Sequence, residues 1–148
     1  MCKNSKVALV IARIIRRRYG CGVPLTDSIE PFRTPHGLYG IFISQEASIG
    51  ENCVIYQQVT VGSNNLKNSR GGYPVIGNNC LIGAGAKIIG GVIIGNDVRI
   101  GANTVIVQNI PDSCTVVLEK PRVIQHNEEL VNEFLPHSEL LYPGGNSR

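Results

Sequence analysis

The chain has 148 residues, of which 43% are hydrophobic, 5% aromatic and 17% charged, with a net charge of +3. This length suits one domain, and the lack of tryptophan together with few other aromatic residues predicts an aliphatic core. The five cysteines are odd in number and include no Cys-x-x-Cys pair, which argues against a disulfide framework or a zinc knuckle, so we expect a protein of the reducing cytoplasm.

The first predicted element is a helix over residues 6–19, where apolar residues recur at helical spacing and arginines point to the other side. We expect this helix to cover the open end of the core, with residues 1–39 serving as helix and lead-in. A helix that is both basic and apolar is also typical of a membrane surface, but we favour the cap and expect no membrane contact. No nucleic-acid motif accompanies the arginines, so nucleic-acid binding is not expected.

A six-residue repeat dominates the middle of the chain. Isoleucine or valine recurs every sixth residue in two series, at Ile43, Ile49, Ile55 and Val61, and at Ile76, Ile82, Ile88, Ile94, Ile100 and Ile106. This period fits neither an amphipathic helix nor a hairpin meander. It fits a three-sided coil of short strands, in which the aliphatic side chains point inward and stack on those of the next coil. Residues 40–124 are therefore predicted to form a β-solenoid.

Smaller residues stand two positions before most of these aliphatic residues, and Cys53 and Cys80 are among them. Both cysteines are therefore predicted to fill the core rather than to act as nucleophiles or ligands. The two series are out of phase, because Val61 and Ile76 are fifteen residues apart. The polar, glycine-rich segment 63–73 between them must leave the coil as a loop, and such loops often carry function.

The tail, residues 125–148, follows the repeats. Its segment 127–135 has the composition of a short helix, and most of the remainder is expected to be poorly ordered.

Three segments resemble a known family: GIFISQEASIGENCVIYQQVTVG, PVIGNNCLIGAGAKIIGGVIIGNDVRIGAN and IPDSCTVV. They are similar to the hexapeptide-repeat acyltransferases, above all to serine acetyltransferases and small relatives that modify sugars. The resemblance implies a left-handed parallel β-helix, against the usual handedness of crossovers, with a short N-terminal α-helix and a C-terminal helical tail. It also implies acetyl-CoA as co-substrate and a homotrimer with active sites between subunits.

Acetyl transfer from a thioester to a hydroxyl needs a general base near the acceptor. The resemblance assigns this role to His36, which stands just before the first repeat. Asp27 or Glu30, a short distance upstream, could orient its imidazole, and the sequence favours neither.

The resemblance also suggests binding residues. Gln57 and Gln58 stand where the family often has histidine, and could hydrogen-bond a hydroxylated acceptor. Arg70 and Tyr73 lie near the end of the loop, where serine acetyltransferases have Arg-His-Pro.

For CoA, the resemblance indicates the corner residues Ala84, Gly85 and Ala102, whose small side chains let the pantetheine arm approach. Lys120 and Arg122 suit its phosphates by charge.

The predicted function is therefore an acetyl-CoA-dependent acetyltransferase for a small hydroxylated acceptor, with serine O-acetyltransferase as one case. The alternative is a catalytically silent scaffold or binding protein. It is favoured by Tyr73 where the family has histidine and by Gln108 where it has lysine. The repeat region lacks the three histidine ligands of a zinc enzyme on this solenoid, so no metal is expected.

Overall fold

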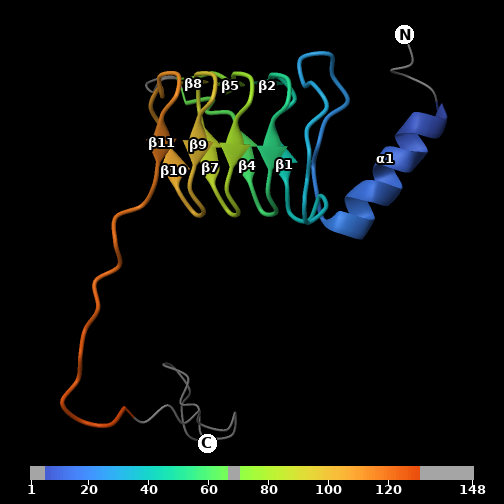
Figure 1. Ribbon diagram of the computed structural model, residues 1–148. Coiled ribbons are helices and arrows are strands. Elements are labelled where there is room, and N and C mark those ends of the chain that lie inside the picture. The colour runs from blue at the N-terminus through green and yellow to red at the C-terminus, as the bar shows by residue number, and fades with distance from the viewer. Residues whose placement is uncertain (1–5, 67–70, 131–148) are drawn as a thin grey trace, which may run out of the picture.

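The computed structural model describes residues 6–66 and 71–130. One helix, α1 (Lys6–Tyr19), precedes a stack of short parallel strands (Figure 1). The strands are β1 (Phe42–Ile43), β2 (Ser48–Ile49), β3 (Val54–Ile55), β4 (Thr60–Gly62), β5 (Val75–Ile76), β6 (Leu81–Ile82), β7 (Lys87–Ile89), β8 (Ile93–Ile94), β9 (Arg99–Ile100), β10 (Val105–Ile106) and β11 (Thr115–Val116). They form three sheets, in the orders β1-β4-β7-β10, β2-β5-β8 and β3-β6-β9-β11, which are the three sides of one coil stack.

The pairing register follows the repeat. Ile43 pairs with Val61, eighteen residues later, so three six-residue units make one coil. Val61 pairs with Ile88, twenty-seven residues later, because the loop adds nine residues to that coil. The last coil is two residues short, since Ile94 bridges to Ile110. The predicted solenoid is confirmed, and the loop accounts for the change of phase between the two series of repeats.

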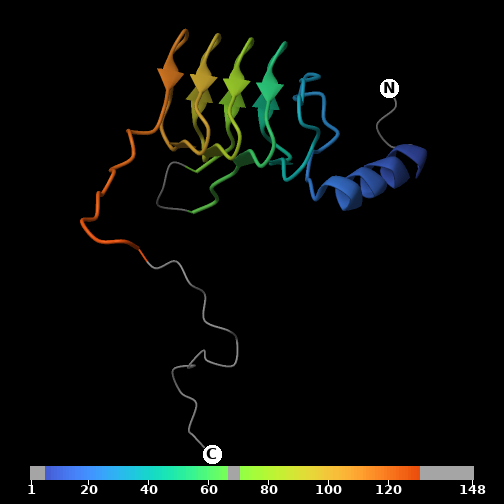
Figure 2. The ribbon, with the colours of Figure 1, turned by 60° about the horizontal axis from the view of Figure 1, so that its bottom comes forward.

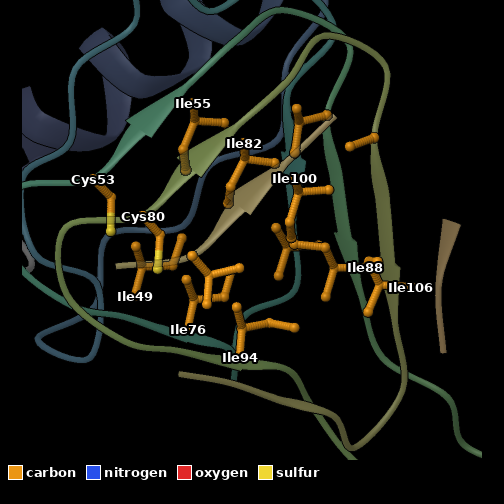
Figure 3. Packing of buried hydrophobic residues seen from close by; sticks show 14 of the residues in the cluster. Ile49, Cys53, Ile55, Ile76, Cys80, Ile82, Ile88, Ile94, Ile100 and Ile106 are labelled. Atoms are coloured by element: carbon orange, nitrogen blue, oxygen red, sulfur yellow. The ribbon is translucent and has the colours of Figure 1, made fainter. Parts of the chain in front are cut away.

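The aliphatic residues of both series line the core (Figure 3), and none of the ten is more than 7% exposed. Cys53 and Cys80 are 0% and 1% exposed and lie one above the other in successive coils, as Figure 3 shows. Their predicted place in the core is confirmed. Burial of each such aliphatic side chain stabilises the fold by roughly 1.5–3 kcal/mol, and no single coil could bury its own.

The turns at one edge of the stack are built from residues that tolerate a left-handed backbone. Asn52, Asn79, Asp97 and Ser113 occupy equivalent places there, with φ between 55° and 59°. Their side chains also join successive coils, because Asn52 Nδ2 donates to Asn79 Oδ1 at 2.9 Å and Asn79 Nδ2 donates to Asp97 Oδ1 at 3.2 Å. Asparagine and aspartate suit this conformation, since their short polar side chains bond locally.

A partial coil precedes the predicted boundary at residue 40. Gly22, Ile29 and Arg33 bridge in parallel to the first strands of the stack. The segment before residue 40 is therefore part of the solenoid, although its strands are single bridges. His36 accordingly lies on the coil stack rather than in a lead-in.

Helix α1 covers the first coil only near its own C-terminal end, and the rest projects away from the stack (Figure 1). The Tyr19 ring meets Tyr39 edge-on, with ring centroids 4.9 Å apart. Val10, Ile11 and Ile14 remain more than half exposed. The helix itself is confirmed, but the prediction that its apolar face caps the core is wrong for most of its described length, since only Ala12, Ile15 and Tyr19 are partly buried.

The chain leaves the stack after β11 (Figure 1). Residues 127–130 contain no helix, so the predicted C-terminal helix is absent over that part, and its remainder lies outside the described residues. Within the described ranges, no helix is both long enough and apolar enough to cross a membrane.

The loop predicted over 63–73 leaves the stack between β4 and β5 (Figure 2). Its base is closed by two backbone hydrogen bonds between Asn64 and Gly72, at 2.9 and 3.0 Å. The base rests on the turn of the next coil, where a Cβ on Gly91 would stand 2.5 Å from the Gly71 carbonyl oxygen. Glycine at position 91 therefore lets the loop lie against the stack.

Replacing Gly91 with alanine should displace the loop, because the new methyl group meets rigid backbone. Amide hydrogen exchange at Asn64 and Gly72 should then accelerate by about tenfold or more, which corresponds to about 1.4 kcal/mol of local stability. Gly62→Ala is the matched control, since its Cβ would meet only the flexible end of Ile89, at 3.1 Å. Equal exchange in both variants would contradict the packing described for the loop base.

Thr104 is the polar exception in the core. It is 4% exposed, and its hydroxyl has no hydrogen-bond partner among the residues that the structure describes. Thr104→Val keeps the shape and removes the unpaired hydroxyl, so we expect a gain in unfolding free energy of about 1 kcal/mol in denaturant titration.

Thr104→Ser should lose about 1 kcal/mol instead, because it keeps the hydroxyl and removes a buried methyl group. A valine variant less stable than the natural protein would show that the hydroxyl is satisfied.

Candidate active site

Four turns stack into a second edge of the solenoid, which we call the glutamine edge: residues 39–40, 57–58, 84–85 and 102–103. Backbone hydrogen bonds join each turn to the next: Gln58 N to Tyr39 O at 2.8 Å, Gly85 N to Gln57 O at 3.0 Å and Asn103 N to Ala84 O at 2.8 Å. The edge therefore places Gln57, Gln58, Ala84, Gly85 and Ala102 in one row. These residues are up to 45 positions apart in the sequence, and only the stacking of coils brings them together.

His36 lies beside this row. A tight turn positions it, in which Gly37 N donates to Thr34 O at 3.0 Å and Gly37 has a φ of 76°. The imidazole Nδ1 is 2.9 Å from Gln57 Oε1, and the ring meets Tyr56 edge-on with centroids 5.4 Å apart. His36 is exposed, so its second nitrogen is open to a small molecule on the surface. The hydrogen-bond partner of Nδ1 is Gln57, and neither Asp27 nor Glu30 takes that place.

The Gln57–Gln58 turn is held from the next coil by a residue that sequence reasoning missed. Lys87, on β7, donates from Nζ to the Gln58 carbonyl oxygen at 2.6 Å. Gln58 has a φ of 62°, and a non-glycine residue in this region needs support from its surroundings. The signal in the sequence was a charged residue among the outward positions of a largely aliphatic repeat.

The next two turns of the glutamine edge carry small residues. Ala84 and Gly85 are partly buried and Ala102 is exposed. Gly85 has a φ of 72°, which favours glycine there. None of these three residues carries a side chain larger than a methyl group, and the Asn103 side chain lies over Gly85, where a Cβ would meet its Oδ1.

Tyr73 is not brought to this edge within one chain. Tyr73, 40% exposed, belongs to the loop, which leaves at the far end of β4 from the Gln57–Gln58 turn. Arg70 lies outside the described residues. Lys120 and Arg122 are exposed in the segment that follows β11. For its described part, the loop does not line a common cleft with His36 in a single chain, because β4 separates them.

A hollow between α1 and the first coil is lined by residues that include Arg16, Gly22 and Phe42. None of its lining residues belongs to the glutamine edge. Among the described residues, no group of three or more histidine, cysteine, aspartate or glutamate side chains is placed to hold a metal ion.

The two stacked cysteines have perturbed thiols but no access to solvent. Contact with the Cys53 thiol and burial raise the pKa of Cys80, whereas contact with Cys80 lowers the pKa of Cys53. Each sulfur lies close to a carbonyl oxygen, at 3.3 Å between Cys53 Sγ and Gly77 O and at 3.2 Å between Cys80 Sγ and Gly95 O. These contacts are those of thiol donors, so we assign both residues as neutral core thiols.

Comparison with known proteins places this edge in context. The family model described as bacterial transferase hexapeptide (six repeats) matches residues 73–108. A serine acetyltransferase from Synechococcus elongatus is 42% identical over 105 residues, which are 71% of this chain and 42% of that protein. The chain spans about half the length of the curated relatives that it matches.

Solved structures are similar as well. Serine acetyltransferase isoform 3 of Entamoeba histolytica, in complex with cysteine, superposes with a TM-score of 0.69 at 35% identity, over 82% of this chain and 44% of that one. A serine acetyltransferase in complex with CoA superposes with a TM-score of 0.59 at 26% identity, over 74% and 43% of the two chains.

The left-handed parallel β-helix that the resemblance implied is therefore confirmed as the fold of the coil stack. Residues 73–108 match the hexapeptide-repeat transferase family, and the coils of the chain are similar to those of serine acetyltransferases.

Proposed function

We propose that the protein is an acetyl-CoA-dependent acetyltransferase that acts on a small hydroxylated acceptor. The observation that carries this proposal is the position of His36 beside the glutamine edge, with Nδ1 bound to Gln57 and Nε2 without a partner among the described residues. The names of the relatives and the CoA complex of one structural neighbour support it.

In the proposed reaction, His36 Nε2 takes the proton of the acceptor hydroxyl as its oxygen attacks the thioester carbonyl carbon. The new C–O bond forms, the C–S bond breaks, and the proton passes from the imidazolium to the departing thiolate of CoA. Gln58, exposed beside His36, is proposed to hydrogen-bond the acceptor. Gln57 is the second acceptor contact suggested by the sequence.

The acetyl-CoA arm is proposed to follow the glutamine edge past Ala84, Gly85 and Ala102, where small side chains leave room. Lys120 and Arg122 are proposed to meet its phosphates, as cations pair well with phosphate oxygens. No metal takes part in the proposed reaction, and the cytoplasm, where acetyl-CoA is available, is its proposed location.

Serine is one proposed acceptor, and a sugar or other small alcohol is the other. The segment that reads Arg-His-Pro in serine acetyltransferases is Gly72-Tyr73-Pro74 here, so glycine replaces the arginine and a phenol replaces the histidine. A phenol suits a neutral hydroxylated acceptor better than it suits a carboxylate. Arg70, close to this segment in sequence, is proposed as a further acceptor contact.

The protein is proposed to work as a homotrimer. His36 and the loop lie at opposite ends of β4, so one chain cannot bring Tyr73 to His36, whereas the loop of a second copy could reach it. Light scattering should accordingly report about three times the chain mass of 16.0 kDa at micromolar concentration. A monomer under these conditions would remove the shared site from the proposal.

The proposed base is tested by His36→Ala. Turnover should fall on the order of a hundredfold or more, while the dissociation constant for CoA, measured by calorimetry, should stay unchanged. His126→Ala is the matched control, because His126 is exposed in the tail after β11. Thiol release from acetyl-CoA is followed with serine, homoserine, simple sugars and amino sugars as acceptors.

The second candidate function is a silent scaffold, favoured by Tyr73 and Gln108 where the family has histidine and lysine. An absence of thiol release with every acceptor, together with no CoA binding, would support the scaffold. Normal turnover by the His36 variant would instead place the base elsewhere.

A further inference from the structure

The hydrogen bond between His36 and Gln57 has a direction that matters for proton transfer. Gln57 Oε1, the atom 2.9 Å from Nδ1, is a carbonyl oxygen and can only accept. With the amide in this orientation, Nδ1 carries the proton. A neutral imidazole protonated at Nδ1 has its lone pair at Nε2, which is the nitrogen that faces away from Gln57.

The backbone around Gln57, which is half-buried, is fixed by hydrogen bonds to neighbouring coils. The Gln57 carbonyl accepts from Gly85 N at 3.0 Å, and the following amide, Gln58 N, donates to Tyr39 O at 2.8 Å. Lys87 Nζ holds the Gln58 carbonyl at 2.6 Å. Bonds from the coils on both sides therefore hold the turn from which the Gln57 side chain reaches the imidazole.

The partner of the imidazole is neutral, which distinguishes this site from one with a carboxylate. A carboxylate both selects the tautomer and stabilises the imidazolium, whereas an amide oxygen selects the tautomer with little effect on the charge. Among the described residues, the titratable groups around the ring include Tyr56, in edge contact, Tyr19 and Tyr39, whose rings lie beside Gly37, and Lys87, which is bound to the Gln58 carbonyl oxygen. Arg33 lies three residues before His36, just ahead of the turn, where it bridges to Val54.

We propose that Gln57 is a positioning residue that holds His36 in its Nδ1-protonated tautomer and so keeps Nε2 available to take the acceptor proton. This inference rests on the proposed acetyl transfer, and it replaces the acceptor-binding role that the sequence suggested for Gln57. Lys87 supports the arrangement by fixing the turn. Gln58 remains an acceptor contact.

The tautomer can be read without turnover. Nitrogen NMR of the full chain labelled with ¹⁵N-histidine, at a pH where the imidazoles are neutral, reports which ring nitrogen of His36 is protonated, and His36→Ala assigns its signals. The natural protein and Gln57→Glu should show Nδ1–H, because both present a carbonyl or carboxylate oxygen to Nδ1. Gln57→Ala should show a shift of population towards Nε2–H. An unchanged tautomer in the alanine variant would overturn the proposal.

Kinetics supply the second readout. Gln57→Ala should lower kcat by roughly 10- to 100-fold with little change in the KM for the acceptor, because a misoriented base affects proton transfer rather than binding. Gln57→Glu should keep kcat within several-fold. It should also move the acid limb of the kcat/KM profile to higher pH. A carboxylate stabilises the imidazolium, so a higher pH is needed to remove its proton.

Gln45→Ala is the matched control, a glutamine in a turn at a different edge, and should leave both readouts unchanged. A rise in KM with unchanged kcat in Gln57→Ala would show that Gln57 binds the acceptor and would overturn the positioning role. If the natural protein transfers no acetyl group to any acceptor, the proposed function fails, while the nitrogen shifts still decide the tautomer.

Discussion

The structure depends on one constraint, which is that each coil must place its isoleucines directly over those of the coil below. An eighteen-residue step satisfies it on all three sides at once, since each side contributes one inward residue and one turn. Once the inward columns are in register, the turns are in register too. The row from Gln57 through Ala84 to Ala102 exists because Ile55, Ile82 and Ile100 are stacked.

The sequence predicts the parts of the fold that obey the period and misses those held by other forces. Ile88 and Cys80 were placed correctly, because a six-residue repeat leaves one orientation for each position. The boundary of the solenoid was placed too late, at residue 40, since only Ile29 of the residues that bridge before it is aliphatic. The direction of α1 was also missed, because exposure of Ile14 depends on how the chain turns at Gly20 and not on helical spacing.

The residues that meet at the glutamine edge of the candidate site were named from the sequence, but their contacts were not. Resemblance indicated His36 and the small corner residues, and the register of the coils explains why they meet. The contact between His36 and Gln57 depends on the turn at Gly37, which lies outside the repeat, so no spacing rule could predict it. Because the sequence does not reveal the geometry of that turn, Asp27 and Glu30 were equally suitable as partners of the imidazole. Lys87 was missed because its contact is with a backbone carbonyl, which no side-chain pattern records.

An edge of a solenoid is rigid in its backbone but gives side chains little burial. His36 is exposed, so packing cannot fix its ring, and the interactions that can are its hydrogen bond to Gln57 and its edge contact with Tyr56. A hydrogen bond in water is worth only about 1 kcal/mol, so it orients the ring well only if its acceptor is itself immobile. The stacked turns supply that immobility through backbone bonds at Gln57 and Gln58 and through Lys87. The stacked coils therefore fix the turn that carries Gln57, and through Gln57 they orient the exposed imidazole.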